Sequence, residues 1–103
     1  PVKGIVRNTE KMIESIHKIN PQAIILVAQV ITSGKLPKYS YIPELNKELA
    51  KLSSRKNVVI VDMAEGFEWQ KDTIADKVHP NKIGAQMMAK IWFEALISFK
   101  DKF

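Results

Sequence analysis

The residues best suited to chemistry lie in one short segment, D-K-V-H-P-N at residues 76–81. A carboxylate three residues before a histidine, as Asp76 stands to His79, can reach the imidazole Nδ1 if the chain turns between them. Such a contact fixes the histidine tautomer and stabilises the imidazolium, so that Nε2 faces outward as a general base. Pro80 and Asn81 are suited to hold the turn and to cap a following helix. Because the pattern is short, a loop histidine beside a helix cap is the alternative.

The other titratable candidates have simpler explanations. His17 follows the periodicity of an expected helix and stands next to Lys18, so we expect a surface histidine. Asp62 ends an expected strand, and Asp72 lies four residues before Asp76. Both are alternative acids for His79, but both also suit a helix cap or a loop-stabilising carboxylate.

The serines show no sign of a nucleophile. Ser33-Gly34 follows an expected strand but lacks the strand–turn–helix setting that a nucleophilic serine needs. The chain has neither a phosphate-binding loop nor a dinucleotide fingerprint, and it has no cysteine. A disulfide scaffold and a cysteine-ligated metal site are therefore excluded. The remaining serines, which also lack such a context, are Ser15, Ser40, Ser53, Ser54 and Ser98.

The hydrophobic pattern predicts the elements that carry this segment. Apolar residues recur at helical spacing over residues 4–20, 41–53 and from 81 onward. Two continuous β-branched runs, 23–31 and 57–63, lack alternation and predict parallel strands buried on both faces. Residues 64–79 are expected to form a loop with one helical turn.

The order α-β-α-β-α predicts an α/β protein, a doubly wound three-layer sandwich with parallel strands. His79 then lies among the loops at the carboxyl ends of the strands, where such sheets place their working sites. Two apolar strands make a sheet with both edges unpaired, whereas sheets usually have about four to six strands. We therefore expect residues 1–103 to form a single partial domain. Its partner is expected to be a missing N-terminal half or a second copy that pairs through a strand.

Composition and charge narrow the function classes. The chain has 103 residues, 46% hydrophobic and 26% charged, with a net charge of +5. The lysines are spread along the chain, which favours a solvated surface over a nucleic-acid partner. No run approaches the ~20 apolar residues of a membrane span, and the first residues do not resemble a signal peptide. Binding of polyanions rests on the charge alone, and a salt-sensitive gel shift would test it.

The segment 76–84, followed by Met88-Ala89 and Trp92, resembles the last conserved block of the SGNH (GDSL-type) hydrolases. The runs 23–31 and 57–63 resemble the strands that precede this block in the family. The combination is most similar to carbohydrate esterase family three, the acetylxylan esterase-like enzymes, in which a Val-Ala-Gln strand like residues 27–29 is typical.

This resemblance implies the C-terminal half of a flavodoxin-like α/β/α sandwich and a role in ester hydrolysis. It implies a serine esterase that removes acetyl groups from carbohydrate, with acetylated xylan as the expected substrate. His79 would be the general base and Asp76 the carboxylate that orients it, with no metal or organic cofactor. Trp69 and Phe67 either line a sugar or acyl site or act as packing anchors. Secretion follows only by analogy with the family.

The chain departs from the family at the nucleophile. The Gly-Asp-Ser block, the oxyanion glycine of the second block and the Gly-x-Asn-Asp block are absent from these residues. We therefore expect the chain to supply Asp76 and His79 to an esterase and to be inactive alone. The alternative is a non-catalytic interaction module or a degenerate paralogue built on half of the fold.

Overall fold

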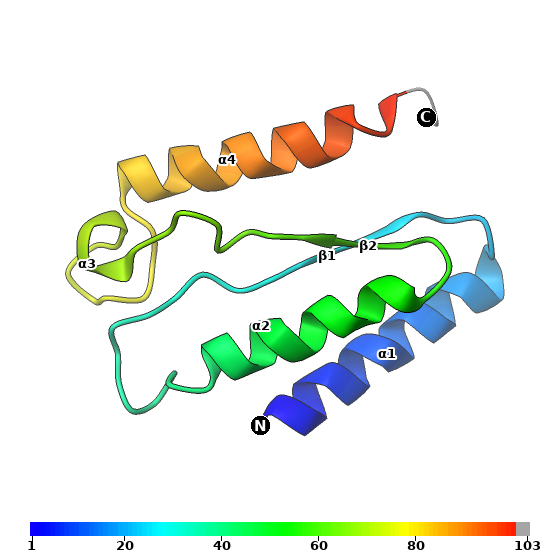
Figure 1. Cartoon of the computed structure of the whole chain (residues 1–103), viewed down its shortest axis with the longest axis horizontal. Coiled ribbons are helices and arrows are strands. Elements are labelled where there is room, and N and C mark those ends of the chain that lie inside the picture. The colour runs from blue at the N-terminus through cyan, green and yellow to red at the C-terminus, as the bar shows by residue number, and fades with distance from the viewer. Residues whose placement is uncertain (101–103) are drawn as a thin grey trace.

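A computed structural model describes residues 1–100 and shows helices alternating with two short strands (Figure 1). The predicted order α-β-α-β-α is confirmed, and the loop 64–79 contains one short helix as expected. The elements are α1 (Val2–Ile19), β1 (Ile25–Ala28), α2 (Ile42–Ala50), the 3₁₀ helix η1 (Lys51–Ser54), β2 (Val58–Val61), α3 (Trp69–Asp72) and α4 (Lys82–Ile97).

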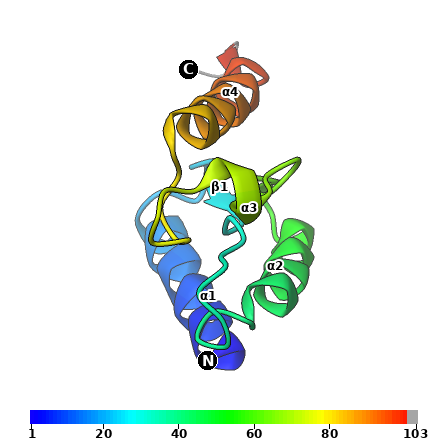
Figure 2. The same cartoon turned by 90° about the vertical axis from the view of Figure 1, so that its left-hand side faces the viewer.

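The two strands pair in parallel, with Ile25 opposite Val58 and Ala28 opposite Val61. Helix α2 provides the crossover that a parallel connection requires. Helices α1 and α2 cover one face of the sheet and α4 lies over the other, as Figure 2 shows end-on. The predicted fold class, a layered α/β sandwich with parallel strands, is therefore confirmed.

The strands are shorter than the apolar runs 23–31 and 57–63 that predicted them. Gln29 N still donates to the carbonyl of Val61 on β2 at 2.9 Å, but the next residue bonds a side chain instead: Val30 N donates to Asn46 Oδ1 at 2.7 Å. Asn46 Nδ2 in turn donates to the carbonyl of Val30 at 2.7 Å. An apolar run indicates burial, but a strand also needs backbone hydrogen bonds to a neighbouring strand. The length of the run therefore overestimates the length of the strand.

The core lies between the sheet, α1 and α2. Its buried members come from each of these elements and from η1, which places the apolar stripe of each helix against the strands. They are Ile13, Leu45, Leu49, Leu52 and Val58. This core joins the sheet to α1 and α2 on one side of the molecule.

The opposite side is less covered than the sequence predicts. All four residues of β1 are only partly buried, which corrects the expectation of a strand buried on both faces. Helix α4 exposes four large apolar side chains, with Phe93 63% exposed. The others are Ile83, Leu96 and Ile97. The physical reason is the width of the sheet, since β1 pairs only with β2 within residues 1–100.

Within residues 1–100, none of the helices combines the length and the apolar character needed to cross a bilayer.

Candidate active site

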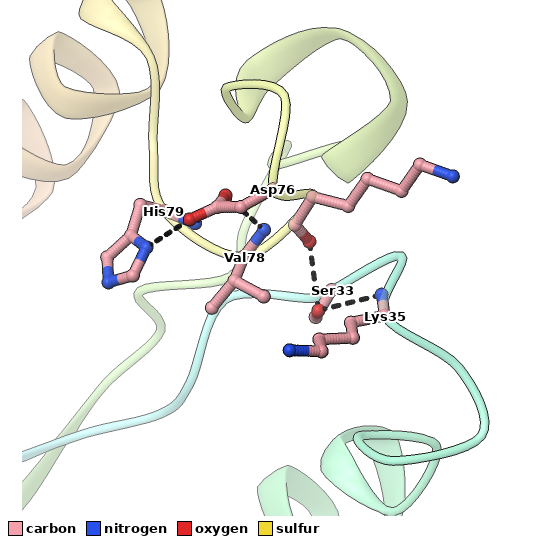
Figure 3. A network of polar contacts seen from close by, with 6 residues as sticks. Ser33, Lys35, Asp76, Val78 and His79 are labelled. Atoms are coloured by element: carbon pink, nitrogen blue, oxygen red, sulfur yellow. Dashed lines mark hydrogen bonds and ion pairs between the residues drawn. The ribbon is translucent and has the colours of Figure 1, made fainter.

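Asp76 and His79 face one another in the loop between α3 and α4 (Figure 3). Asp76 Oδ2 lies 2.5 Å from His79 Nδ1. The imidazole side chain is 73% exposed and the carboxylate 39% exposed. The predicted contact between these two residues is therefore present. Because Nδ1 is engaged by Asp76, Nε2 is the ring nitrogen that can exchange a proton with another group.

The pair is built by a tight turn over residues 76–79. The second carboxylate oxygen of Asp76, Oδ1, accepts from the backbone N–H of Val78 at 2.8 Å and of His79 at 3.0 Å. Lys77 adopts φ 63°, a left-handed conformation that is uncommon outside glycine. An aspartate that bonds its own backbone two and three residues on is a standard way to hold such a turn.

These contacts also set the charge of the carboxylate. The pKa of Asp76 is lowered from 3.8 to about 2, first by the side-chain hydrogen bond from His79 and then by the backbone N–H groups of His79 and Val78. Asp76 is therefore ionised at neutral pH and can only accept hydrogen bonds. It follows that His79 Nδ1 carries a proton, so that a neutral imidazole has its lone pair on Nε2.

The base of the loop is closed by backbone bonds. Ile74 N donates to the carbonyl of His79 at 2.9 Å, and Thr73 forms an antiparallel bridge with Pro80. Asn81 continues this closure, because its N–H donates to the carbonyl of Asp72 at 2.8 Å. The loop that carries His79 is thus anchored to α3 at one end and to α4 at the other.

Asn81 caps α4 as predicted. Its Oδ1 accepts from Gly84 N at 2.9 Å, which satisfies one of the free N–H groups of the first turn. Its Nδ2 donates to the carbonyl of Lys71 at 2.8 Å, so the same side chain ties α4 to α3. The cap is part of what fixes His79 relative to the rest of the molecule.

The alternative acids lie elsewhere. Asp72 is 2% exposed and its Oδ2 accepts from Glu68 N at 2.8 Å, so it stabilises α3, as the simpler explanation predicted. Asp62 is exposed, and no hydrogen bond joins it to His79 among the described residues. Of the carboxylates considered, the structure brings only Asp76 to the imidazole.

His17 is more buried than the sequence predicts. It is half-buried, and its Nε2 lies 2.9 Å from the carbonyl oxygen of Ala23. The ring therefore links the end of α1 to the approach of β1, which corrects the expected surface position. The prediction was wrong because the chain folds back after Pro21, and helical periodicity carries no information about that return.

Sequence reasoning missed the contribution of Ser33 and Gly34. The Ser33 hydroxyl and the Gly34 N–H both donate to the carbonyl of Lys77, each at 2.9 Å. Ser33 is 7% exposed, so its hydroxyl is committed to this contact. The only sequence signal was a polar Ser-Gly pair directly after an apolar run.

Trp69 and Phe67 both act as packing residues. The ring of Trp69 lies against Gly34 so closely that a Cβ there would be 2.3 Å from Cε3. Phe67 is buried, and its Cε2 lies 3.0 Å from where a Cβ on Gly84 would be. The two aromatic residues also line a cavity of about 470 Å³ between the loops that follow β1 and β2. The packing role is therefore present, and the cavity leaves a binding role open to test.

Residues 1–100 contain no group of three or more His, Asp or Glu side chains placed to hold a metal ion.

The GDSL-like Lipase/Acylhydrolase family model matches residues 1–87. The chain belongs to this family. The resemblance predicted from the segment 76–84 is therefore confirmed, and function in ester hydrolysis is supported at the level of the family.

Related proteins agree with this assignment. The chain is 38% identical over 65 residues to a multidomain esterase of Ruminococcus flavefaciens, a match that covers 63% of this chain and 8% of that protein. The esterase domain of the ZfL2-1 ORF1 protein from the zebrafish ZfL2-1 retrotransposon has a TM-score of 0.83 at 16% identity. A carbohydrate esterase family 3 structure from Talaromyces cellulolyticus has a TM-score of 0.76 at 21% identity. Because both identities are low, at 16% and 21%, these two similarities establish only the fold of the chain.

The matches also differ in extent. The alignments cover 95% and 100% of this chain, but only 60% of the zebrafish domain and 52% of the Talaromyces enzyme. The chain thus spans little more than half of either esterase structure.

Proposed function

We propose that this chain provides the acid–base residues of a serine esterase that removes acetyl groups from carbohydrate. The observation that carries the proposal is the Asp76–His79 pair: Asp76 Oδ2 lies 2.5 Å from His79 Nδ1, and no hydrogen bond engages Nε2 among residues 1–100. The chain also belongs to a family of acylhydrolases. Acetylated xylan is the substrate that we propose to test first, because one similar fold belongs to a carbohydrate esterase of family 3.

In the proposed reaction, His79 Nε2 accepts the proton of a serine hydroxyl as its oxygen attacks the acetyl carbonyl. The imidazolium, stabilised by Asp76, then donates that proton to the departing sugar oxygen, and an acetyl-serine remains. Water then attacks the acetyl-serine and gives its proton to His79 Nε2. His79 returns that proton to the serine oxygen as the acetyl–serine bond breaks and acetate leaves. General base catalysis of this kind contributes about 10²–10⁴-fold to the rate.

We propose that the serine comes from polypeptide outside these 103 residues. Two observations support this: the sequence lacks a Gly-Asp-Ser block, and the hydroxyl of Ser33 is buried in its bond to Lys77. The partly buried β1 and the exposed apolar side chains of α4, such as Phe93, fit the same proposal. A further segment that pairs with β1 and packs on α4 would supply both the missing strands and the nucleophile. A second copy of this chain would supply only strands.

The proposal is tested by acetate release from 4-nitrophenyl acetate and acetylated xylan. The open reading frame upstream of these residues is sequenced, and the complete polypeptide that it encodes is expressed. Its activity is then compared with that of the 103-residue chain. We expect activity in the complete polypeptide, none in the chain alone, and a loss of about 10³-fold or more in His79→Ala. His17→Ala is the matched control and should keep the wild-type rate, because the hydrogen bond of its ring goes to the Ala23 carbonyl and not to the Asp76–His79 pair.

The outcomes separate the two functions considered. Activity that survives His79→Ala would exclude His79 as the base. A complete polypeptide that binds acetylated carbohydrate but never releases acetate would favour the non-catalytic module. Hydrolysis of 4-nitrophenyl acetate without hydrolysis of acetylated xylan would support the esterase activity but contradict the proposed carbohydrate substrate.

A further inference from the structure

The segment that follows β1 makes direct contact with the catalytic turn. Ser33 Oγ and Gly34 N converge on a single acceptor, the carbonyl oxygen of Lys77, each at 2.9 Å. Ser33 and Lys77 are 44 residues apart in the sequence, so the contact joins two separate loops. Figure 3 shows Ser33 below the turn that holds Asp76, Val78 and His79, with Lys35 next to Ser33 on the same segment.

The Ser33 hydroxyl has a defined orientation. Its oxygen accepts from Lys35 N at 3.1 Å, which leaves its proton directed at the carbonyl of Lys77. Ser33 is 7% exposed, so water has little access to replace either bond. A buried hydroxyl with both a donor and an acceptor satisfied is a fixed contact.

The carbonyl of Lys77 belongs to the same peptide group as the N–H of Val78. That N–H donates to Asp76 Oδ1 at 2.8 Å, while Asp76 Oδ2 contacts His79 Nδ1. One rigid peptide plane is therefore held by Ser33 and Gly34 on its carbonyl side and by Asp76 on its N–H side. If the plane rotated, the carboxylate would lose a donor and its alignment with the imidazole.

The backbone of this turn needs such support. Lys77 has φ 63°, a region that lysine rarely adopts, so the conformation persists only where surrounding contacts favour it. The ring of Trp69 packs against Gly34 and keeps the supporting segment in place. The support thus comes from the segment that follows β1.

We infer that Ser33 is a positioning residue for the Asp76–His79 pair, acting through the Lys77–Val78 peptide group. This inference deepens the proposed esterase function and rests on it for its effect on rate. The hydroxyl of Ser33 bonds Lys77 and Lys35 N, and no hydrogen bond joins it to His79 among residues 1–100. It sets the orientation of the carboxylate that holds the imidazole.

Three variants of the complete polypeptide test the inference. Ser33→Ala removes the donor, and Ser33→Cys keeps the shape but weakens the donor. Ser54→Ala is the matched control, because its hydroxyl also donates to a backbone carbonyl, that of Lys51, but on η1. Two readouts are taken: kcat and KM for 4-nitrophenyl acetate, and the low-field proton resonance of His79 Nδ1, identified by its absence in His79→Gln.

We expect Ser33→Ala to lower kcat by about 10- to 100-fold with KM changed less than about twofold, because misplacement of a catalytic group affects chemistry more than binding. The Nδ1 resonance should broaden or disappear in Ser33→Ala and persist in Ser54→Ala. Ser33→Cys should behave like Ser33→Ala, since a filled space without a strong donor does not restore the bond. If Ser33→Ala fails to fold, Ser33→Cys carries the test.

The outcomes separate the inference from the proposed function. An unchanged Nδ1 resonance, or a kcat within about twofold of an active wild type, overturns the positioning role and leaves the esterase function intact. A wild type without esterase activity overturns the proposed function. In that case a Ser33-dependent Nδ1 resonance still supports the positioning contact. Wild-type behaviour in Ser33→Cys together with a defect in Ser33→Ala means that Ser33 only fills space.

Discussion

The carboxylate of Asp76 contacts His79 twice, once through Oδ2 to the ring Nδ1 at 2.5 Å and once through Oδ1 to the backbone N–H at 3.0 Å. The same residue thus fixes both the ring and the backbone that carries it. Rotation of the imidazole away from this geometry would break the first contact, and movement of the loop would break the second. The first two predictions follow from this double contact.

Replacing Asp76 by Asn should remove most of the activity while leaving the turn largely formed. The amide oxygen can still accept from Val78 N, but the amide N–H₂ cannot accept from Nδ1 and so favours the wrong imidazole tautomer. We expect kcat of the complete polypeptide to fall by about 10³–10⁴-fold. Asp62→Asn, at an exposed carboxylate, is the control and should retain wild-type kcat. More than a tenth of the activity remaining in Asp76→Asn would contradict the prediction.

Stability should depend on pH through Asp76 in a defined acid window. The pKa of this carboxyl is about 2 in the folded protein against an ordinary 3.8, so the unfolded chain binds the proton first as pH falls. The stabilisation by ionised Asp76 is therefore fully present above about pH 4 and lost between about pH 4 and pH 2.

Urea unfolding of wild type and Asp76→Asn at a series of pH values measures this effect. The difference between their free energies of unfolding should shrink as pH falls through the window, since Asn does not titrate. A carbon NMR titration of the Asp76 carboxyl should give the same low midpoint. A difference that stays constant from pH 5 to pH 2 would show that the carboxylate gains nothing from folding.

Replacing Gly84 by Ala should destabilise the protein although Gly84 lies in a helix. A Cβ at this position would be 2.3 Å from the carbonyl oxygen of Asp72 and 3.1 Å from Pro80 Cβ, so α4 would have to shift. We expect the steric cost to lower the free energy of unfolding by about 1–3 kcal/mol. The better helix propensity of alanine offsets at most about 1 kcal/mol of this cost.

Gly4→Ala is the matched control for this steric effect. Gly4 also lies in a helix, α1, but nothing is within 4 Å of its Cβ position. It should raise stability by about 0.5–1 kcal/mol, because only the propensity term remains. Urea unfolding followed by circular dichroism measures both variants. Equal effects of the two substitutions would show that the close approach at Gly84 is unimportant.

Replacing Asn81 by Ala should weaken the junction between α3 and α4. The substitution removes the cap on Gly84 N and the donor to the carbonyl of Lys71, so a loss of about 1–2 kcal/mol is expected. Asn81→Asp keeps an oxygen for the cap but loses the donor, and should fall between wild type and Ala. Amide exchange at Gly84 should accelerate in Ala and stay slow in Asp. Identical stabilities of the two variants would mean that the cap bond contributes little.

The sequence by itself determined the parts of this protein that depend on neighbours along the chain. The order of helices and strands, the Asn81 cap and the contact between Asp76 and His79 were all predicted. Each arises from residues within one or two turns of one another, where spacing alone limits the geometry. The family assignment rests on the same local segment, 76–84, and the match over residues 1–87 confirmed it.

Only the tertiary structure decided what happens between distant segments. The bonds of Ser33 to Lys77 and of Asn46 to Val30 join residues that are 44 and 16 positions apart, whose encounter depends on how the layers stack. The shortness of β1 and the exposure of α4 have the same origin, because burial needs a partner surface that a single strand or helix does not encode. Local patterning thus specified a histidine with its carboxylate, whereas the contact of Ser33 and Gly34, after β1, with Lys77 specified what holds them in place.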